Sequence, residues 1–194
     1  MELKQNFTVA HARAVVWEYF DNVDELARCM PGASLSEPAS GNRIRGTIAV
    51  KLGPISAEFA GEGEIERDGA NFRGVFRGSG RDSRSGSRAK GEITYVLAED
   101  RDGAATRVDV SVAYSLAGPL AQFGRGGIVN DLAQRLTAEF AKNLEARLDH
   151  QAAAAAAGEA APRVSAPARL DAGALLWSVM WRRVKAFFAR LFGG

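Results

Sequence analysis

The side chains that most often perform catalysis or bind metals are few in this sequence. The two histidines, His11 and His150, each lack a second ligand at the spacing of a zinc site. The single cysteine, Cys29, has apolar neighbours, which is typical of an inert buried thiol rather than of a nucleophile. The motifs of serine hydrolases, P-loop enzymes and dinucleotide-binding proteins are absent. We therefore predict no catalytic residues and no metal site.

A different pattern, in which phenylalanines alternate with glycines, runs through the middle of the chain. It occurs at 59–63 and again at 72–78. A closely packed sheet would carry Val, Leu or Ile at such positions, and glycine weakens a strand. Two interpretations are open and compatible. The glycines let the sheet bend strongly, or they leave an apolar space that a ligand fills.

The elements that would position these residues are strands. Apolar and polar residues alternate from 33 to 117, which predicts about six antiparallel strands with one solvent-exposed face. Asp68-Gly69 and Asp102-Gly103 are typical hairpin turns between them. The pattern before this region predicts a strand at 3–9 and two short helices, at 11–20 and 23–30.

A long amphipathic helix is predicted after the strands, from Pro119 to Leu148. Its apolar residues recur four apart from Ile128 onward, which leaves one face to be buried. The only partner broad enough for a helix of this length is the predicted sheet. The sequence therefore predicts an α+β fold in which a curved antiparallel sheet packs against a long C-terminal helix.

Charge is distributed unevenly along the chain. From residue 163 onward there are six basic residues and one acidic residue, a net charge of +5, which leaves −3 for the rest of a chain whose total is +2. An acidic body argues against nucleic-acid binding, and the basic end suggests an anionic partner of its own. A single cysteine and a polar first segment without a signal-peptide pattern predict a cytoplasmic protein.

The last 45 residues differ from the rest in composition. Residues 150–168 are rich in Ala and Pro and predict a linker. Residues 169–194 predict an amphipathic helix, and basic residues in its middle exclude a membrane span. The pattern is typical of a helix that lies in the bilayer interface, with packing on a partner protein or on its own domain as the alternative. The residues expected to bind the membrane are Trp177, Trp181, Arg182, Arg183, Lys185, Phe187 and Phe188.

Three arginines, Arg81, Arg84 and Arg88, surround a predicted hairpin that is rich in Gly and Ser, at 78–87. The simplest interpretation is a flexible loop. The alternative is a gate over a ligand cavity or a docking patch.

Five short motifs occur in a specific order within residues 2–148. They are Cys29-Met30-Pro31-Gly32, Gly53-Pro54, Phe59-Ala60-Gly61, Ala89-Lys90-Gly91 and Leu120-Ala121-Gln122-Phe123-Gly124. In this order and spacing they resemble the family of the CoxG subunit of carbon monoxide dehydrogenase. The order of predicted elements likewise resembles the START/SRPBCC helix-grip fold, and the linker and tail look like those of membrane-associated members.

The resemblance implies carriage rather than catalysis. CoxG proteins accompany molybdenum hydroxylases of the carbon monoxide dehydrogenase type, and they are associated with membrane recruitment and quinone binding in the helix-grip cavity. It implies a ligand-binding domain at 1–149, a location on the inner face of the cell membrane, and menaquinone or ubiquinone as the carried ligand. The residues expected to line the site are Phe59, Phe72, Phe76, Tyr95, Tyr114, Leu132, Leu136 and Phe140.

Two other functions are compatible with the same residues. The protein could anchor or help assemble the hydroxylase without carrying a ligand. It could also be a cyclase-type enzyme of the same fold, which would require an acid–base pair facing the ligand site. For quinone carriage, the hydroxyl of Tyr95 or Tyr114 is the expected donor to a quinone carbonyl.

Overall fold

The computed structural model describes residues 1–52, 55–124 and 127–158. Strand β1 (Glu2–Val9) is followed by the short helices α1 (Arg13–Asp21) and α2 (Val23–Cys29). A 3-10 helix, η2 (Pro119–Gly124), and the long helix α3 (Gly127–Ala156) end the described part. Between α2 and η2 lie β2 (Ala33–Leu35), β3 (Arg43–Leu52), β4 (Ile55–Asp68), β5 (Arg73–Asp82), β6 (Arg88–Asp100), the 3-10 helix η1 (Arg101–Gly103) and β7 (Ala105–Ala117).

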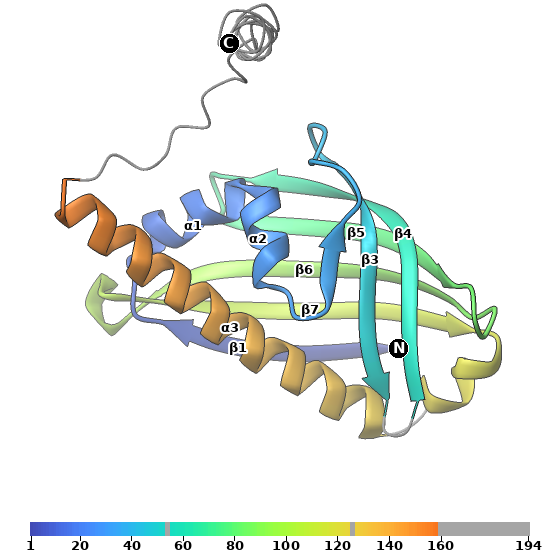
Figure 1. Cartoon of the computed structure of the whole chain (residues 1–194). Helices are drawn as coiled ribbons and strands as arrows, with labels where there is room; N and C mark the ends of the chain where they lie inside the picture. The colour runs from blue at the N-terminus through green and yellow to red at the C-terminus, as the bar shows by residue number, and fades with distance from the viewer. Residues whose placement is uncertain (53–54, 125–126, 159–194) are drawn as a thin grey trace, which may run out of the picture. The chain divides into compact units, whose positions relative to one another are not determined.

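The seven strands form one curved antiparallel sheet in the order β1-β7-β6-β5-β4-β3-β2, and the helices α1, α2 and α3 lie on one side of it (Figure 1). The predicted architecture is therefore confirmed. Consecutive strands from β2 to β7 pair as hairpins, which short turns permit. Strand β1 instead pairs with β7, so that Glu2 lies opposite Ala113.

The two faces of the sheet differ as the alternating sequence predicts. Residues that face the helices, such as Phe59, Ile65 and Leu97, are buried. The opposite, outer face carries exposed glutamates that pair with arginines of neighbouring strands. These ion pairs join Arg43 to Glu64, Arg45 to Glu62, and Arg77 to both Glu66 and Glu92.

The predicted helix at 119–148 is wrong at its start. Pro119–Gly124 is a separate 3-10 helix, and α3 begins only at Gly127. The sequence explains the interruption because three glycines fall within 124–127, and glycine is a poor helix former. At its other end α3 continues through the alanines to Ala156 because alanine has the highest helix propensity.

The core consists of two separate clusters within the compact unit Met1–Ala153. The larger one joins α1, α2 and the second half of α3 to one end of the sheet, with Val16, Phe20, Leu144 and Leu148 at its centre. The smaller one lies at the other end and is built on Ala57, Phe59 and Leu120. Part of the inner face of the sheet lies between the two clusters.

The predicted linker falls mostly, and the tail helix with its seven membrane-binding residues entirely, outside the described residues. Among the helices that the structure describes, none combines the length and apolar character needed to cross a bilayer.

Candidate ligand-binding site

Apolar residues of the inner face between the two clusters belong to neither cluster. We call the strand residues Phe76, Gly91, Ile93, Val112 and Tyr114 the inner strip. Strand register places them side by side, since Phe76 pairs with Ile93, Ile93 with Val112, and Gly91 with Tyr114. All five are half-buried, as are four residues of the first half of α3: Val129, Leu132, Ala133 and Leu136.

Three inner-face glycines provide room for aromatic rings that lie flat on the sheet. A Cβ atom at Gly74 would lie 2.1 Å from the Tyr95 ring, and one at Gly63 would lie 2.4 Å from the Phe76 ring. A Cβ atom at Gly78 would lie 2.7 Å from the same Phe76 ring. The alternation of Phe and Gly is explained at these positions by ring packing, which neither of the two sequence-based interpretations included.

Gly91 differs from these glycines because the space above it is open. Among the described residues, the only atom near a Cβ at Gly91 would be the carbonyl oxygen of Ala113, at 3.6 Å, an ordinary contact distance. Gly91 lies in the centre of the inner strip, opposite Gly78 on one side and Tyr114 on the other. At this point the face of the sheet has no side chain, and no ring of the described residues covers it.

Three of the predicted lining residues, Phe72, Tyr95 and Phe140, belong to an aromatic group at the α1 end. Phe20 of α1 lies 5.1 Å from Tyr95 and 6.3 Å from Phe140, measured between ring centroids. Trp17 of α1 lies 5.7 Å from Phe72. The sequence did not predict that Trp17 and Phe20 belong to this group. Their place on an apolar helix shows that they can be buried, but it does not show which strands α1 contacts.

The other predicted residues lie outside this aromatic group, on the sheet and on α3. Phe59 is part of the smaller cluster, close to η2. Phe76 and Tyr114 are in the inner strip, and Leu132 and Leu136 are half-buried on α3. The eight predicted residues are thus spread from one cluster to the other over the sheet, α3 and the turn before β5, and whether a ligand contacts them remains a prediction.

The two tyrosine hydroxyls differ in their hydrogen bonding. The Tyr114 hydroxyl donates to the carbonyl of Gly124, at 3.2 Å. The Tyr95 hydroxyl is buried and has no hydrogen-bond partner among the described residues. Burial raises the pKa of Tyr95 to about 12, so it remains a neutral donor at physiological pH. Leaving a buried hydroxyl without a hydrogen bond costs free energy, so Tyr95 is the tyrosine whose hydroxyl is available to donate to a ligand.

Helix α3 is fastened unequally along its length. In its second half, Asn143 donates to the carbonyl of Cys29 at 3.0 Å, and Arg147 forms an ion pair with Glu25 at 2.8 Å. In its first half, the one side-chain bond to the sheet among the described residues joins Gln5 to Asn130, at 3.5 Å. The half of α3 that faces the open part of the sheet is therefore the less constrained half.

The candidate nucleophile and the buried carboxylate both have structural roles. Cys29 is fully buried, and burial raises the pKa of its thiol, as expected for an inert residue. Asp82 is buried at an inner-face position, but it accepts hydrogen bonds from the backbone of Glu58, Arg84 and Ser85. The hydrogen bond from the Ser85 hydroxyl, together with these backbone bonds, lowers the pKa of Asp82, so it remains a charged turn-forming group.

In the ranges that the structure describes, no three His, Cys, Asp or Glu side chains gather closely enough to hold a metal ion. Within the described residues, the inner face offers apolar surface, one buried hydroxyl without a partner and no charged residue in the inner strip. Such a surface suits a neutral, largely apolar molecule.

Solved structures with this fold come from several bacteria. A conserved protein from Geobacillus kaustophilus has a TM-score of 0.66 at 14% identity, covering 78% of this chain and 97% of its own. The Zhui aromatase/cyclase from Streptomyces sp. R1128 has a TM-score of 0.56 at 12% identity, covering 80% and 97%. A START superfamily protein from Mycobacterium smegmatis has a TM-score of 0.52 at 13% identity, covering 77% and 98%. At these identities the likeness shows the START-like fold alone.

No curated protein matches the sequence. The family model for CoxG, a subunit of carbon monoxide dehydrogenase, however, matches residues 6–149, which include half of β1, the other six strands and most of α3. The chain therefore belongs to the CoxG family.

Proposed function

We propose that this protein is a non-catalytic carrier of a respiratory quinone, either menaquinone or ubiquinone, which links a molybdenum hydroxylase of carbon monoxide dehydrogenase type to the membrane. The observation that carries the proposal is the open inner face at Gly91, between two packed clusters. Membership of the CoxG family supports the same class of function.

The chemistry of the inner face favours a quinone over other apolar molecules. A quinone head is flat and uncharged, and its carbonyl oxygens accept hydrogen bonds. In the proposal, the Tyr95 hydroxyl, which has no partner among the described residues, is the donor at the end of the site near α1. The half-buried side chains of Phe76, Leu132 and Leu136 supply apolar surface for an isoprenoid tail.

The proposed path of the ligand follows from the unequal fastening of α3. The first half of α3 makes few polar contacts with the sheet, and Ile128 there is 44% exposed. A small displacement of this half would admit a ligand without disturbing the core at Leu144 and Leu148. In the proposal the tail, through residues 169–194, holds this domain at the bilayer from which the quinone comes.

The direct test is to fill the open position and measure ligand content. Gly91→Phe adds a ring to the inner strip, and Ala113→Phe adds the same ring to the outer face of the neighbouring strand. Both proteins are purified from the native organism's membranes or from quinone-containing cells, and bound lipids are extracted and identified by mass spectrometry. We expect quinone with the unmodified chain and with Ala113→Phe, and none with Gly91→Phe.

Thermal unfolding establishes that both variants are folded, and Gly91→Ala, whose side chain fits the space, serves as a second variant that should retain the ligand. Equal quinone content in Gly91→Phe and Ala113→Phe would show that the ligand site lies elsewhere. No extractable quinone in any of the proteins would favour the alternative, an anchoring adaptor without a ligand.

An enzymatic function is less well supported, although an aromatase/cyclase shares the fold. A cyclase needs a group that exchanges protons at the ligand site. The buried carboxylate of the described inner face, Asp82, accepts hydrogen bonds from the turn that follows β5 and from the backbone of Glu58 in β4.

A further inference from the structure

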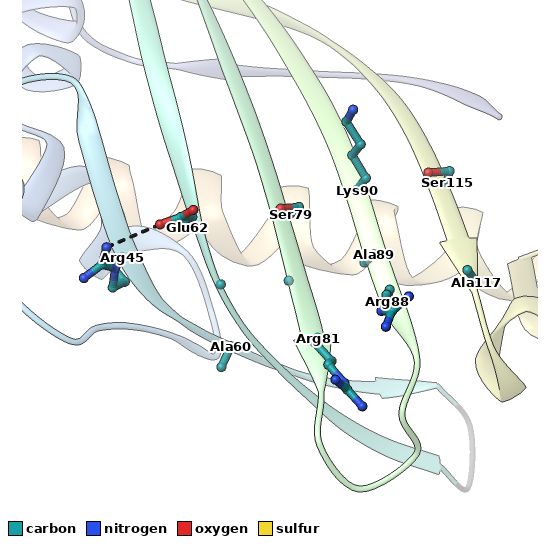
Figure 2. Close-up of a pocket in the computed structure, with 12 residues that line it drawn as sticks. Arg45, Ala60, Glu62, Ser79, Arg81, Arg88, Ala89, Lys90, Ser115 and Ala117 are labelled. Carbon is teal, nitrogen blue, oxygen red and sulfur yellow. Dashed lines mark hydrogen bonds and ion pairs between the residues drawn. The ribbon is translucent and has the colours of Figure 1, made fainter.

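A hollow of about 560 Å³ lies on the outer face of the sheet, opposite to the inner strip. It extends across β3 to β7 near the hairpin that joins β5 and β6 (Figure 2). Its floor is made of small residues, among them Ala60, Ser79 and Ser115. Four basic side chains surround this floor, and one acidic side chain joins them: Arg45, Arg81, Arg88, Lys90 and Glu62.

The cations of the hollow fall into two groups. Arg45 is neutralised, since it pairs with Glu37 and with Glu62, each at 3.4 Å. Arg81, Arg88 and Lys90 have no acidic partner within 4.0 Å among the described residues, in contrast to the paired arginines elsewhere on the outer face. The hollow therefore carries positive charge that the described part of the chain does not neutralise.

Strand register brings two of these cations directly opposite each other. Arg81 of β5 pairs with Arg88 of β6, and Lys90 follows two residues along on the same face. Like charges directly opposite in adjacent strands destabilise a sheet. An anion bound between these side chains would remove the repulsion, so the arrangement is one that a ligand would stabilise.

The hairpin that carries the arginines is held firmly. Asp82 accepts hydrogen bonds from the turn backbone at Arg84 and Ser85, and Gly86 donates back to the Asp82 carbonyl. The fully buried Ser87 hydroxyl accepts from the backbone of Leu120, which fastens the hairpin to η2. Internal bonding of this kind favours a docking surface over a flexible loop, because it fixes the strand ends from which Arg81 and Arg88 extend.

We propose that this hollow docks an acidic segment of a partner protein, with glutamate or aspartate carboxylates bound by Arg81, Arg88 and Lys90. Guanidinium groups bind carboxylates through two parallel hydrogen bonds. The floor offers hydroxyls from Ser79 and Ser115 but no large apolar side chain that would enter a bilayer. The concave form and the lack of a large apolar side chain in the lining favour a protruding protein segment over a membrane.

The test uses the full chain and a fluorescein-labelled peptide of alternating Glu and Ala, with alternating Gln and Ala as the uncharged control peptide. Fluorescence anisotropy measures the Kd of the unmodified chain, of Arg81→Gln/Arg88→Gln, and of Arg73→Gln/Arg107→Gln. The second pair makes the same charge change at the other end of the outer face. We expect the first pair to weaken binding of the acidic peptide at least about tenfold, and the second pair less than about twofold.

Carbodiimide coupling locates the bound peptide, because it joins a carboxylate to a lysine amine in contact with it. We expect mass spectrometry to find the acidic peptide on Lys90, and Lys90→Arg to abolish this cross-link while retaining binding. Equal weakening by both arginine pairs, cross-links away from Lys90, or no binding of the acidic peptide would each overturn the proposal.

Vesicles of phosphatidylcholine with phosphatidylglycerol test the other kind of partner. If Arg81→Gln/Arg88→Gln weakens vesicle binding but leaves peptide binding unchanged, the hollow is a lipid site and the proposal is wrong. Equal vesicle binding by both arginine pairs, together with selective loss of the peptide, supports it. The outcome is independent of quinone carriage, which is measured at Gly91 on the other face.

Discussion

Glycines of the inner face differ in whether an aromatic ring covers them. Gly74 lies opposite Tyr95 in register, and the Tyr95 ring occupies the space that the missing side chain leaves. Gly91 also lies opposite a tyrosine, Tyr114, but no ring of the described residues comes near a Cβ at Gly91, and the space there is open. A single methyl group would therefore have opposite consequences at the two positions, a strong clash at Gly74 and an ordinary contact at Gly91.

The two tyrosines of the inner face give a matched pair of substitutions. Tyr114→Phe removes the hydrogen bond to Gly124, so we expect it to lower the free energy of unfolding by about 1 kcal/mol. Tyr95→Phe removes a buried hydroxyl without a partner among the described residues, so we expect unchanged or slightly raised stability in the ligand-free protein. Urea unfolding of both variants checks the comparison.

In quinone affinity, unlike in stability, we expect Tyr95→Phe to be the more affected of the two variants. If Tyr95 donates to a quinone carbonyl, Tyr95→Phe loses about tenfold in quinone affinity, whereas Tyr114→Phe retains it. Titration with a short-chain quinone, followed by tryptophan fluorescence, measures both affinities. Strong destabilisation of the ligand-free protein by Tyr95→Phe would mean that the hydroxyl has a partner in solution.

For single residues, the sequence predicts which apolar side chains face inward but not which of them pack together. Phe59 and Phe72 belong to the same alternating pattern, yet they lie in different clusters. Grouping depends on strand register and on where α1 crosses the sheet, and neither is encoded in the spacing of one strand. The outer-face hollow could not be predicted for the same reason. Arg45 and Lys90 line the same hollow as Arg81 and Arg88 only because the sheet places β3, β5 and β6 near one another.

Among the elements, α3 has two halves with different tasks. The second half carries the fully buried Leu144 and Leu148 and the bonds to α2. The first half carries half-buried leucines above the sheet. One continuous helix can thus be both a fixed part of the core and a more loosely held cover.

Alanine substitutions separate the two halves. Leu144→Ala leaves a cavity in the packed cluster, and we expect it to lower the free energy of unfolding by roughly 2–5 kcal/mol. Leu136→Ala removes a half-buried side chain, and we expect a loss of about 1 kcal/mol or less, together with weaker quinone binding. Urea unfolding and quinone titration measure the two effects, and a Leu136→Ala loss as large as that of Leu144→Ala would show a packed core beneath the first half.

The β5–β6 hairpin gives a pH-dependent prediction. Because the pKa of Asp82 is lowered in the folded state, its contribution to stability is present above the unfolded value of about 3.9 and is lost as the pH falls toward the folded value. Asp82→Asn removes this contribution. We expect Asp82→Asn to lower the urea midpoint at neutral pH, with the difference from the unmodified chain shrinking below about pH 4.

Asp102→Asn makes the same substitution in an exposed turn and serves as the control. An equal change in the urea midpoint for both variants, or a difference for Asp82→Asn that persists in acid, would contradict the assigned role of Asp82.

The elements themselves follow largely from the sequence. Period-two alternation and Asp-Gly turns predict the strands from β3 to β7, and Asn22 caps α2 by accepting from the backbone of Glu25. The boundary between η2 and α3 did not follow, because an apolar periodicity that continues across glycines does not show whether the backbone remains α-helical.

For the molecule as a whole, the sheet separates two surfaces of different chemistry. The inner face is apolar and has an open position at Gly91, and the outer face has an unneutralised basic hollow among the described residues. Under our proposals a quinone and an acidic partner segment occupy opposite sides of one layer of strands. The tail would add a third contact, with the membrane.

The membrane contact is tested in the full chain by Trp177→Ala/Trp181→Ala. Loss of two indole rings from the predicted apolar sector should reduce co-sedimentation with anionic vesicles by about tenfold or more. Neutral phosphatidylcholine vesicles, measured alongside, report the share of binding that depends on the basic residues. Unchanged sedimentation of the double variant would favour a protein partner for the tail.

The pairing of β1 with β7 affects how the protein folds during its synthesis. Glu2 of β1 lies opposite Ala113 of β7, so β1 leaves the ribosome well before the strand with which it pairs. Until β7 is synthesised, the backbone hydrogen-bonding groups of β1 are unpaired and available for aggregation with other chains. Such distant pairing slows folding, and we expect nascent chains that end before β7 to depend on chaperones more than chains that include it.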